Sequence, residues 1–148
     1  MAAWKKFSSR DAAVIEGCFT DDAVWIVPER NATALALGAG ETRRMNRRQI
    51  ADFLARDFGR IFIGGVNIEV TGLYGDGDTV IMEHRFRAKL ANGRSYENEY
   101  CFVFKVREGR IAEMREYMDT LGGFRQIFGE EAIGVVSPMV ADSQAQPA

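Results

Sequence analysis

The sequence predicts a single α+β domain in which helices cover one face of a curved antiparallel sheet. Three observations indicate this fold class. Apolar residues recur at helical spacing before Val66, they alternate with a period of two from Val66 onward, and short turns join the later segments. Helices first and strands afterwards are typical of an α+β domain. A length of 148 residues allows one substantial core and not two.

The first half is expected to begin with one bent helix or two short ones over residues 2–18. Polar residues 20–22 end this segment, and a short apolar strand follows over 23–27, before Pro28. A connection of irregular composition runs through Gly40. Asn46 and Gln49 have the spacing of a capping box, which predicts a helix up to about Phe58, with Gly59 just beyond it.

The second half is expected to form a meander of four strands, over residues 66–74, 79–90, 95–106 and 110–119. Turns this short join antiparallel neighbours. A closing helix is expected over 120–128. The domain is therefore predicted to span residues 1–130, followed by a C-terminal extension over 131–148 that becomes a flexible polar tail from about residue 140.

Composition and charge exclude several classes of function. A formal net charge of -2 provides no basic field for phosphates, so no nucleic acid partner is expected. Cys18 and Cys101 lie far apart in sequence and are interpreted as reduced, packed thiols, with no metal site. The chain has neither a signal-length apolar core nor a run of about 20 apolar residues, so we expect a cytoplasmic protein with no membrane partner.

Alternation along the second and third strands separates two faces. In the second strand one face is mostly apolar and the other mostly charged, and the simple interpretation puts the charged face in water. The apolar face holds Val80, Met82, His84, Phe86 and Ala88, and the other holds Ile81, Glu83, Arg85, Arg87 and Lys89. Aromatic residues share one face of the third strand with Asn98, and Glu116 stands between Met114 and Met118 on the fourth.

Three segments carry a resemblance to a known family: Asp21-Asp22-Ala23-Val24-Trp25, then the run from Gly93 to Tyr100, then Gly109-Arg110-Ile111 leading into Arg115-Glu116-Tyr117-Met118-Asp119-Thr120. Their order and spacing resemble the SnoaL-like, ketosteroid isomerase-related branch of the nuclear transport factor two-like superfamily, over residues 4–128. The resemblance implies a cone-shaped fold, in which a curved antiparallel sheet wraps around N-terminal helices and encloses a pocket.

Limonene epoxide hydrolase is the member of that superfamily with the most similar charge pattern. Aligning its pattern with this sequence implies that Glu83, Arg85 and Glu116 converge in the pocket as catalytic residues. The charged face of the second strand would then point inward, and His84 would take a packing or interface role. An outward apolar strip of Val80, Met82, His84 and Phe86 would form a homodimer through the outer sheet face. The expected substrate-binding residues are Trp25, Phe53, Asn98, Tyr100, Phe102, Met114 and Met118.

The function expected from these residues is that of a cofactor-free acid–base enzyme, an isomerase, cyclase or lyase. Its partner would be a small, mostly apolar or amphipathic carbonyl compound. Glu83 or Glu116 would take a proton next to the carbonyl, while Arg85, with Tyr100, would stabilise the oxyanion. Two alternatives stay open: an epoxide hydrolase in which Glu116 activates water, and a non-catalytic small-molecule binding module.

An arginine cluster precedes and begins the helix with the capping box, where positive charge is unfavourable without an acidic partner. It consists of Arg43, Arg44, Arg47 and Arg48. We interpret the cluster as a solvated face, with a gate for an anionic ligand as the alternative.

Overall fold

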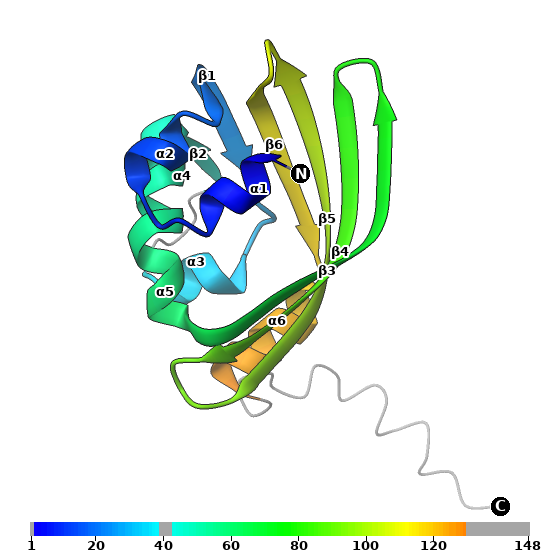
Figure 1. Ribbon diagram of the computed structural model, residues 1–148. Coiled ribbons are helices and arrows are strands. Elements are labelled where there is room, and N and C mark those ends of the chain that lie inside the picture. The colour runs from blue at the N-terminus through cyan, green and yellow to red at the C-terminus, as the bar shows by residue number, and fades with distance from the viewer. Residues whose placement is uncertain (1, 39–42, 130–148) are drawn as a thin grey trace, which may run out of the picture.

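A strongly bent six-stranded sheet forms the body of the protein in a computed structural model that describes residues 2–38 and 43–129 (Figure 1). The strand order is β2-β1-β6-β5-β4-β3. Neighbouring strands are antiparallel except β1 and β6, which are parallel. The strands are β1 (Phe19–Ile26), β2 (Arg44–Asn46), β3 (Phe62–Asp76), β4 (Thr79–Leu90), β5 (Ser95–Arg107) and β6 (Arg110–Met118). The predicted C-terminal extension over 131–148 lies outside the described residues.

Two short helices open the chain, α1 (Ala2–Phe7) and α2 (Ala12–Glu16), which confirms the second of the two expected arrangements. Asp11 caps α2 by accepting hydrogen bonds from the backbone N–H groups of Ala13 and Val14. Between the helices, Arg10 has a φ of 58°, a left-handed conformation that no α-helix continues through. The chain therefore bends at Arg10.

The segment predicted as an irregular connection contains a further helix, α3 (Ala32–Ala36), capped by Asn31. It leads to β2, which pairs with β1 and was not predicted either. A second correction concerns β1, which begins at Phe19 and not at Ala23. A register shift between Phe19 and Val24 lets β1 pair with β6 while accommodating the polar residues between them.

The predicted capping box of Asn46 and Gln49 is confirmed. The helix that it begins has three parts, α4 (Arg47–Asp52), a π-helical turn η1 (Phe53–Asp57) and α5 (Phe58–Ile61). It continues through Gly59 to Ile61, three residues further than predicted, before the chain enters β3. Figure 1 shows these helices, together with α2 and α3, on the inner side of the bent sheet.

The predicted meander is confirmed, and so is the closing helix α6 (Thr120–Phe128), whose N-terminus is capped by Asp119. β3 begins at Phe62, earlier than expected. Register shifts against β4 around Gly64 and Gly65 let the strand bend there, and Gly65 adopts a positive φ of 62°. In Figure 1, β3, β4 and β5 bend strongly, and α6 lies beneath the bend.

The faces of β4 follow simple alternation, so the inward placement of Glu83 and Arg85 is wrong. Met82, His84 and Phe86 are buried, whereas Glu83 is exposed. Arg85 pairs with Glu99 at 3.0 Å on the outer face, and a neighbouring ion-pair network joins Arg85, Arg87, Glu69 and Glu97. These charges stay partly hydrated while they pair across strands, whereas turning the strand would have exposed the apolar side chains instead.

The outward strip of Val80, Met82, His84 and Phe86 is wrong for the same reason, because these side chains line the inner face. The homodimer through the outer sheet face stays a prediction, but other side chains would have to form its interface. The outer face presents the half-buried Ile81, Cys101 and Val103 beside the exposed Tyr117. Side chains of this kind suit an interface better than isolated charges do.

Val103→Glu is expected to shift such a dimer toward monomer in sedimentation, because it would place a carboxylate beside Ile81 and Cys101 in the expected interface. Ser95→Glu, at the exposed end of the same strand face, is the matched control and should leave the assembly unchanged. An undisturbed dimer in the Val103 variant would exclude this surface.

Among residues 2–38 and 43–129, no helix has both the length and the apolar character required to cross a membrane.

Candidate active site

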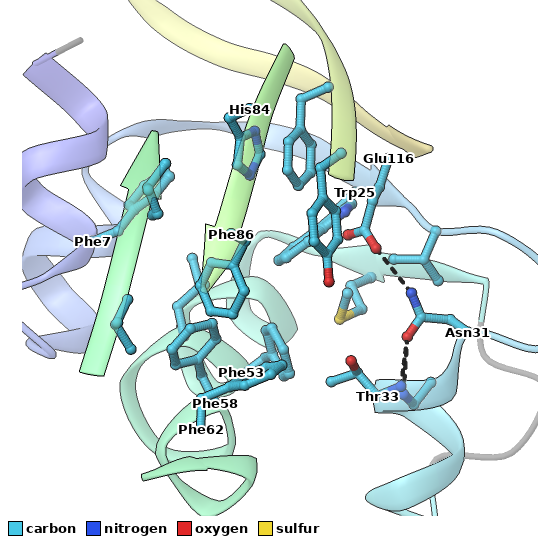
Figure 2. Close-up of a pocket in the computed structure, with 18 of the residues that line it drawn as sticks. Phe7, Trp25, Asn31, Thr33, Phe53, Phe58, Phe62, His84, Phe86 and Glu116 are labelled. Carbon is cyan, nitrogen blue, oxygen red and sulfur yellow. Dashed lines mark hydrogen bonds between the residues drawn. The ribbon is translucent and has the colours of Figure 1, made fainter. Parts of the chain in front are cut away.

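A pocket of about 510 Å³ opens between the inner face of the sheet and the helices. It lies where two buried apolar clusters meet, one around Trp25 and Phe102 and the other around Phe62 and Phe86. Figure 2 shows aromatic side chains facing the pocket from β1, β4, η1 and α5. Its volume is within the range of small-molecule sites, about 300–1,000 Å³.

One wall of the pocket is a stack of flat rings on β4 and β5. The rings of His84, Tyr100 and Phe102 lie side by side and within 9° of parallel, and the His84 centroid is 5.3 Å from that of Tyr100 and 5.4 Å from that of Phe102. Trp25 approaches Phe102 with a centroid separation of 6.1 Å. Such a wall suits a ligand with flat, apolar rings.

Glu116 is the one acidic side chain among the described residues that line this pocket. β6 places it opposite Phe102 on the inner face, and its exposed fraction is 7%. Burial raises the pKa of Glu116 from 4.5 to about 7, and the hydrogen bond from Asn31 offsets part of that effect. Trp25 Nε1 also lowers the pKa, although it makes no hydrogen bond of good geometry within the described residues. Near neutral pH, the carboxyl group exists in both protonation states.

Asn31 fixes the orientation of this carboxyl group (Figure 2). Its Oδ1 accepts hydrogen bonds from the backbone N–H groups of Thr33 and Ala34, at 3.0 and 3.1 Å. Capping therefore turns the amide NH₂ toward Glu116, where Nδ2 donates to Oε1 at 2.9 Å. The sequence interpretation missed Asn31. Asparagine directly before the Ala-rich run 32–36 was the available signal, because it is a preferred N-cap.

A polar chain behind the ring stack ends at Tyr100. Asn98 Nδ2 donates to the backbone oxygen of Asp119 at 2.9 Å and to the hydroxyl of Tyr96 at 3.1 Å. The hydroxyls of Tyr96 and Tyr100 lie 2.7 Å apart. Burial raises the pKa of Tyr100 well above 10, and the charge of Glu116 adds to the increase. The Tyr100 hydroxyl is therefore uncharged at neutral pH and can donate a hydrogen bond, and a negative charge on Glu116 makes its ionisation still less favourable.

The structure brings part of the predicted site together. Five of the predicted residues line the pocket: Trp25, Phe53, Tyr100, Phe102 and Glu116. Three others are displaced from its surface. Asn98 is buried behind Tyr96, Met114 is in the core, and Met118 accepts a 3.5 Å hydrogen bond from Asn31. Glu83 and Arg85 lie on the outer sheet face and cannot join Glu116 in the pocket.

His84 lines the pocket, opposite to the expectation that it would face away. Its exposed fraction is 3%, and desolvation lowers its pKa from 6.5 to about 4. The imidazole is therefore neutral at physiological pH. It contributes an aromatic surface and brings no positive charge near Glu116.

His84→Phe is expected to make the protein less sensitive to acid. In the wild type, the unfolded state binds more protons than the native state between pH 6.5 and about 4, so the free energy of unfolding falls as pH drops through this window. This effect is worth about 2 kcal/mol at pH 5. Denaturant unfolding at pH 5 and pH 8 measures it. A variant whose stability relative to wild type is the same at both pH values would contradict the neutral, desolvated state of His84.

The arginine cluster does not line the pocket, which favours the solvated-face interpretation. Arg43 pairs with Glu29 at 3.0 Å, and Arg47 pairs with Asp21 and with Glu16. Within the described part of the chain, no three His, Cys, Asp or Glu side chains group as metal ligands would.

The comparisons with known proteins agree with this architecture. No curated protein sequence gives a significant match. The fold is similar to that of a nuclear transport factor two-like protein of unknown function from Burkholderia pseudomallei, at 19% identity, with 85% of this chain and 92% of that chain covered and a TM-score of 0.69. It is also similar to a putative isomerase from Bacillus subtilis, at 22% identity, 86% and 91% coverage and a TM-score of 0.67.

A third similar structure is a limonene epoxide hydrolase-like epoxide hydrolase of M. tuberculosis, at 21% identity, with 88% of this chain and 90% of that chain covered and a TM-score of 0.62. These structural similarities support the cone-shaped, nuclear transport factor two-like fold that the resemblance implied. The match to a family model is more specific. Residues 2–114, well over half of the sequence, match the SnoaL-like domain. The chain therefore belongs to the SnoaL-like domain family.

Proposed function

We propose that the protein is a cofactor-free acid–base enzyme, an isomerase, cyclase or lyase that acts on a small, mostly apolar carbonyl compound. The observation that carries this proposal is Glu116, a buried carboxyl group in an aromatic pocket whose pKa of about 7 suits proton transfer near neutral pH. Membership of the SnoaL-like family supports the same class of chemistry.

In the proposed reaction, ionised Glu116 takes the proton from the carbon next to the substrate carbonyl. The C–H electron pair moves into the C–C bond, and the carbonyl oxygen becomes an enolate. Tyr100, kept neutral by its raised pKa, donates a hydrogen bond to that oxygen. An isomerase would return the proton from Glu116 to another carbon. A cyclase would let the enolate carbon attack a second carbonyl of the substrate and give the proton to the new alkoxide.

The positions of Tyr100 and Glu116 support these roles. Glu116 pairs with Phe102 across β5 and β6, so Tyr100 is its diagonal neighbour on the same face. Side chains in that relation lie within reach of a shared ligand. Asn31 donates its hydrogen bond to Oε1, so Oε2 is the oxygen proposed to take the proton.

The epoxide hydrolase alternative is less well supported. The pattern that suggested it requires three charged groups in the pocket, and two of them, Glu83 and Arg85, lie on the outer sheet face. Glu116 would have to both activate water and protonate the epoxide oxygen.

Deuterium exchange tests the proposal without knowledge of the natural substrate. 2-Tetralone, a flat bicyclic ketone with exchangeable protons next to its carbonyl, would be incubated with the protein in D₂O and followed by NMR. The wild-type protein is expected to accelerate exchange above the buffer rate, and Glu116→Gln should not. Tight binding without accelerated exchange, for 2-tetralone and for other enolisable ketones that bind, would favour the non-catalytic binding module.

A further inference from the structure

Two cations line the pocket at the end formed by α1 and the bend after it. They are Lys5 and Arg10, on either side of Phe7 in sequence. Figure 2 shows Phe7 on one side of the pocket, with Asn31 and Glu116 on the other. The carboxyl group and the two cations are therefore contributed from different ends of an apolar cavity.

Two contacts hold the Arg10 side chain in place. Its Nη1 donates to the backbone oxygen of Leu54 in η1 at 2.9 Å, and its guanidinium carbon lies 4.5 Å from the ring centroid of Phe58. Its left-handed φ of 58° costs free energy in a residue other than glycine. One N–H of the guanidinium is used by Leu54, and within the described residues the others have no hydrogen-bond partner. The Arg10 guanidinium is thus held in position and has further N–H groups that can donate to a ligand.

Neither cation is neutralised by the protein. The acidic residues of the adjacent wall are already paired, Asp52 with Arg56 and Asp57 with Arg60. Lys5 and Arg10 have no carboxylate within ion-pair distance among the residues that the structure describes. The chain as a whole carries a formal net charge of -2, so a positive pocket end is a local feature and does not follow from the overall charge.

We propose that Lys5 and Arg10 form a subsite for a carboxylate, so that the substrate is an aromatic or alicyclic keto acid. This inference rests on the proposed function, which places the carbonyl end of the substrate. The carbonyl would meet Glu116 and Tyr100, the rings would lie against His84 and Phe102, and the carboxylate would reach the two cations. The opposite orientation is disfavoured because ionised Glu116 would repel the carboxylate of the ligand.

A matched pair of fluorescent probes tests the charge preference. 1-Anilinonaphthalene-8-sulfonate is an anion, and N-phenyl-1-naphthylamine is its neutral counterpart with the same rings. The wild-type protein is expected to bind the anion more tightly at low ionic strength, and added salt should weaken binding of the anion only. Lys5→Met and Arg10→Gln should each weaken binding of the anion by about two- to five-fold and leave the neutral probe unchanged.

Lys6→Met is the matched control, because Lys6 lies on the same helix, carries the same charge and does not line the pocket. Equal weakening of both probes in the Lys5 and Arg10 variants, or an equal effect of Lys6→Met, would overturn the carboxylate subsite. If Arg10→Gln fails to fold because the Leu54 contact is lost, Lys5→Met decides the question. A charge preference that persists while 2-tetralone and the other enolisable ketones bind without accelerated exchange would refute the acid–base proposal and leave the subsite intact.

Discussion

Glu116→Gln is expected to slow turnover by about 10²- to 10⁴-fold while the protein still folds and binds its ligand. Glutamine has the same shape, and its Oε1 can still accept the hydrogen bond from Asn31, but its amide cannot take up a proton. In the wild type, kcat/KM should rise with pH around the Glu116 pKa of about 7, because the carboxylate is the base. Initial rates of deuterium exchange across pH 5–9 measure both effects.

Stability separates the catalytic role from a structural one. Because burial raises the pKa of Glu116, the native state binds more protons than the unfolded state between about pH 4.5 and pH 7. The free energy of unfolding therefore falls as pH rises through this window, by about 3 kcal/mol at most. The Gln variant escapes this loss and should be the more stable protein at pH 8, with little difference at pH 4.5. Near-wild-type turnover in the Gln variant would exclude Glu116 as the proton carrier.

Local signals explain how much of the fold was predictable. The capping box at Asn46, the turns of the meander and the helix from Thr120 to Phe128 each depend on residues close in sequence, and each is confirmed. α3 and β2 were missed because they contain five and three residues, too few for a periodic pattern. β2 exists because it pairs with β1, a contact that propensity does not encode.

Part of the candidate site was predictable from the alternation of side chains along single strands. Glu116 between Met114 and Met118 indicated a buried acid, and its fourth-strand position brought it into the pocket with Tyr100 and Phe102. Asn31 could not be found in this way, because its hydrogen bond to Glu116 joins residues 85 positions apart.

The misplacement of Glu83 and Arg85 has a physical explanation. A period of two separates the faces of a strand without saying which face is inside. The cross-strand partners decide the question here, since Arg85 and Arg87 stand opposite Glu99 and Glu97 of β5. Those acidic residues share the face that does not carry Tyr96, Tyr100 and Phe102. The aromatic face of β5 and the charged face of β4 therefore could not both point inward, and charge pairing across the strands agreed with the simple alternation.

Tyr100→Phe is expected to lower kcat/KM by about 10²- to 10³-fold, the usual effect of removing one donor to a developing oxyanion. The ring would remain stacked against His84 and Phe102, so ligand affinity and thermal stability should change little. The pH dependence should still report Glu116, because the base is untouched. Exchange rates for 2-tetralone, with the dissociation constant of the neutral naphthylamine probe, separate the two effects.

Tyr96→Phe is the matched control for Tyr100→Phe. Asn98 donates to the Tyr96 hydroxyl, and either hydroxyl can donate in the Tyr96–Tyr100 hydrogen bond. When Tyr96 donates to Tyr100, the Tyr100 hydroxyl can donate into the pocket. Losing Tyr96 should weaken Tyr100 as a donor and reduce the rate by no more than about tenfold, or about 1.4 kcal/mol. If both variants lose activity equally, the chain of hydroxyls acts as one unit behind the ring wall. If only Tyr96→Phe loses activity, Tyr100 is not the group that meets the oxyanion.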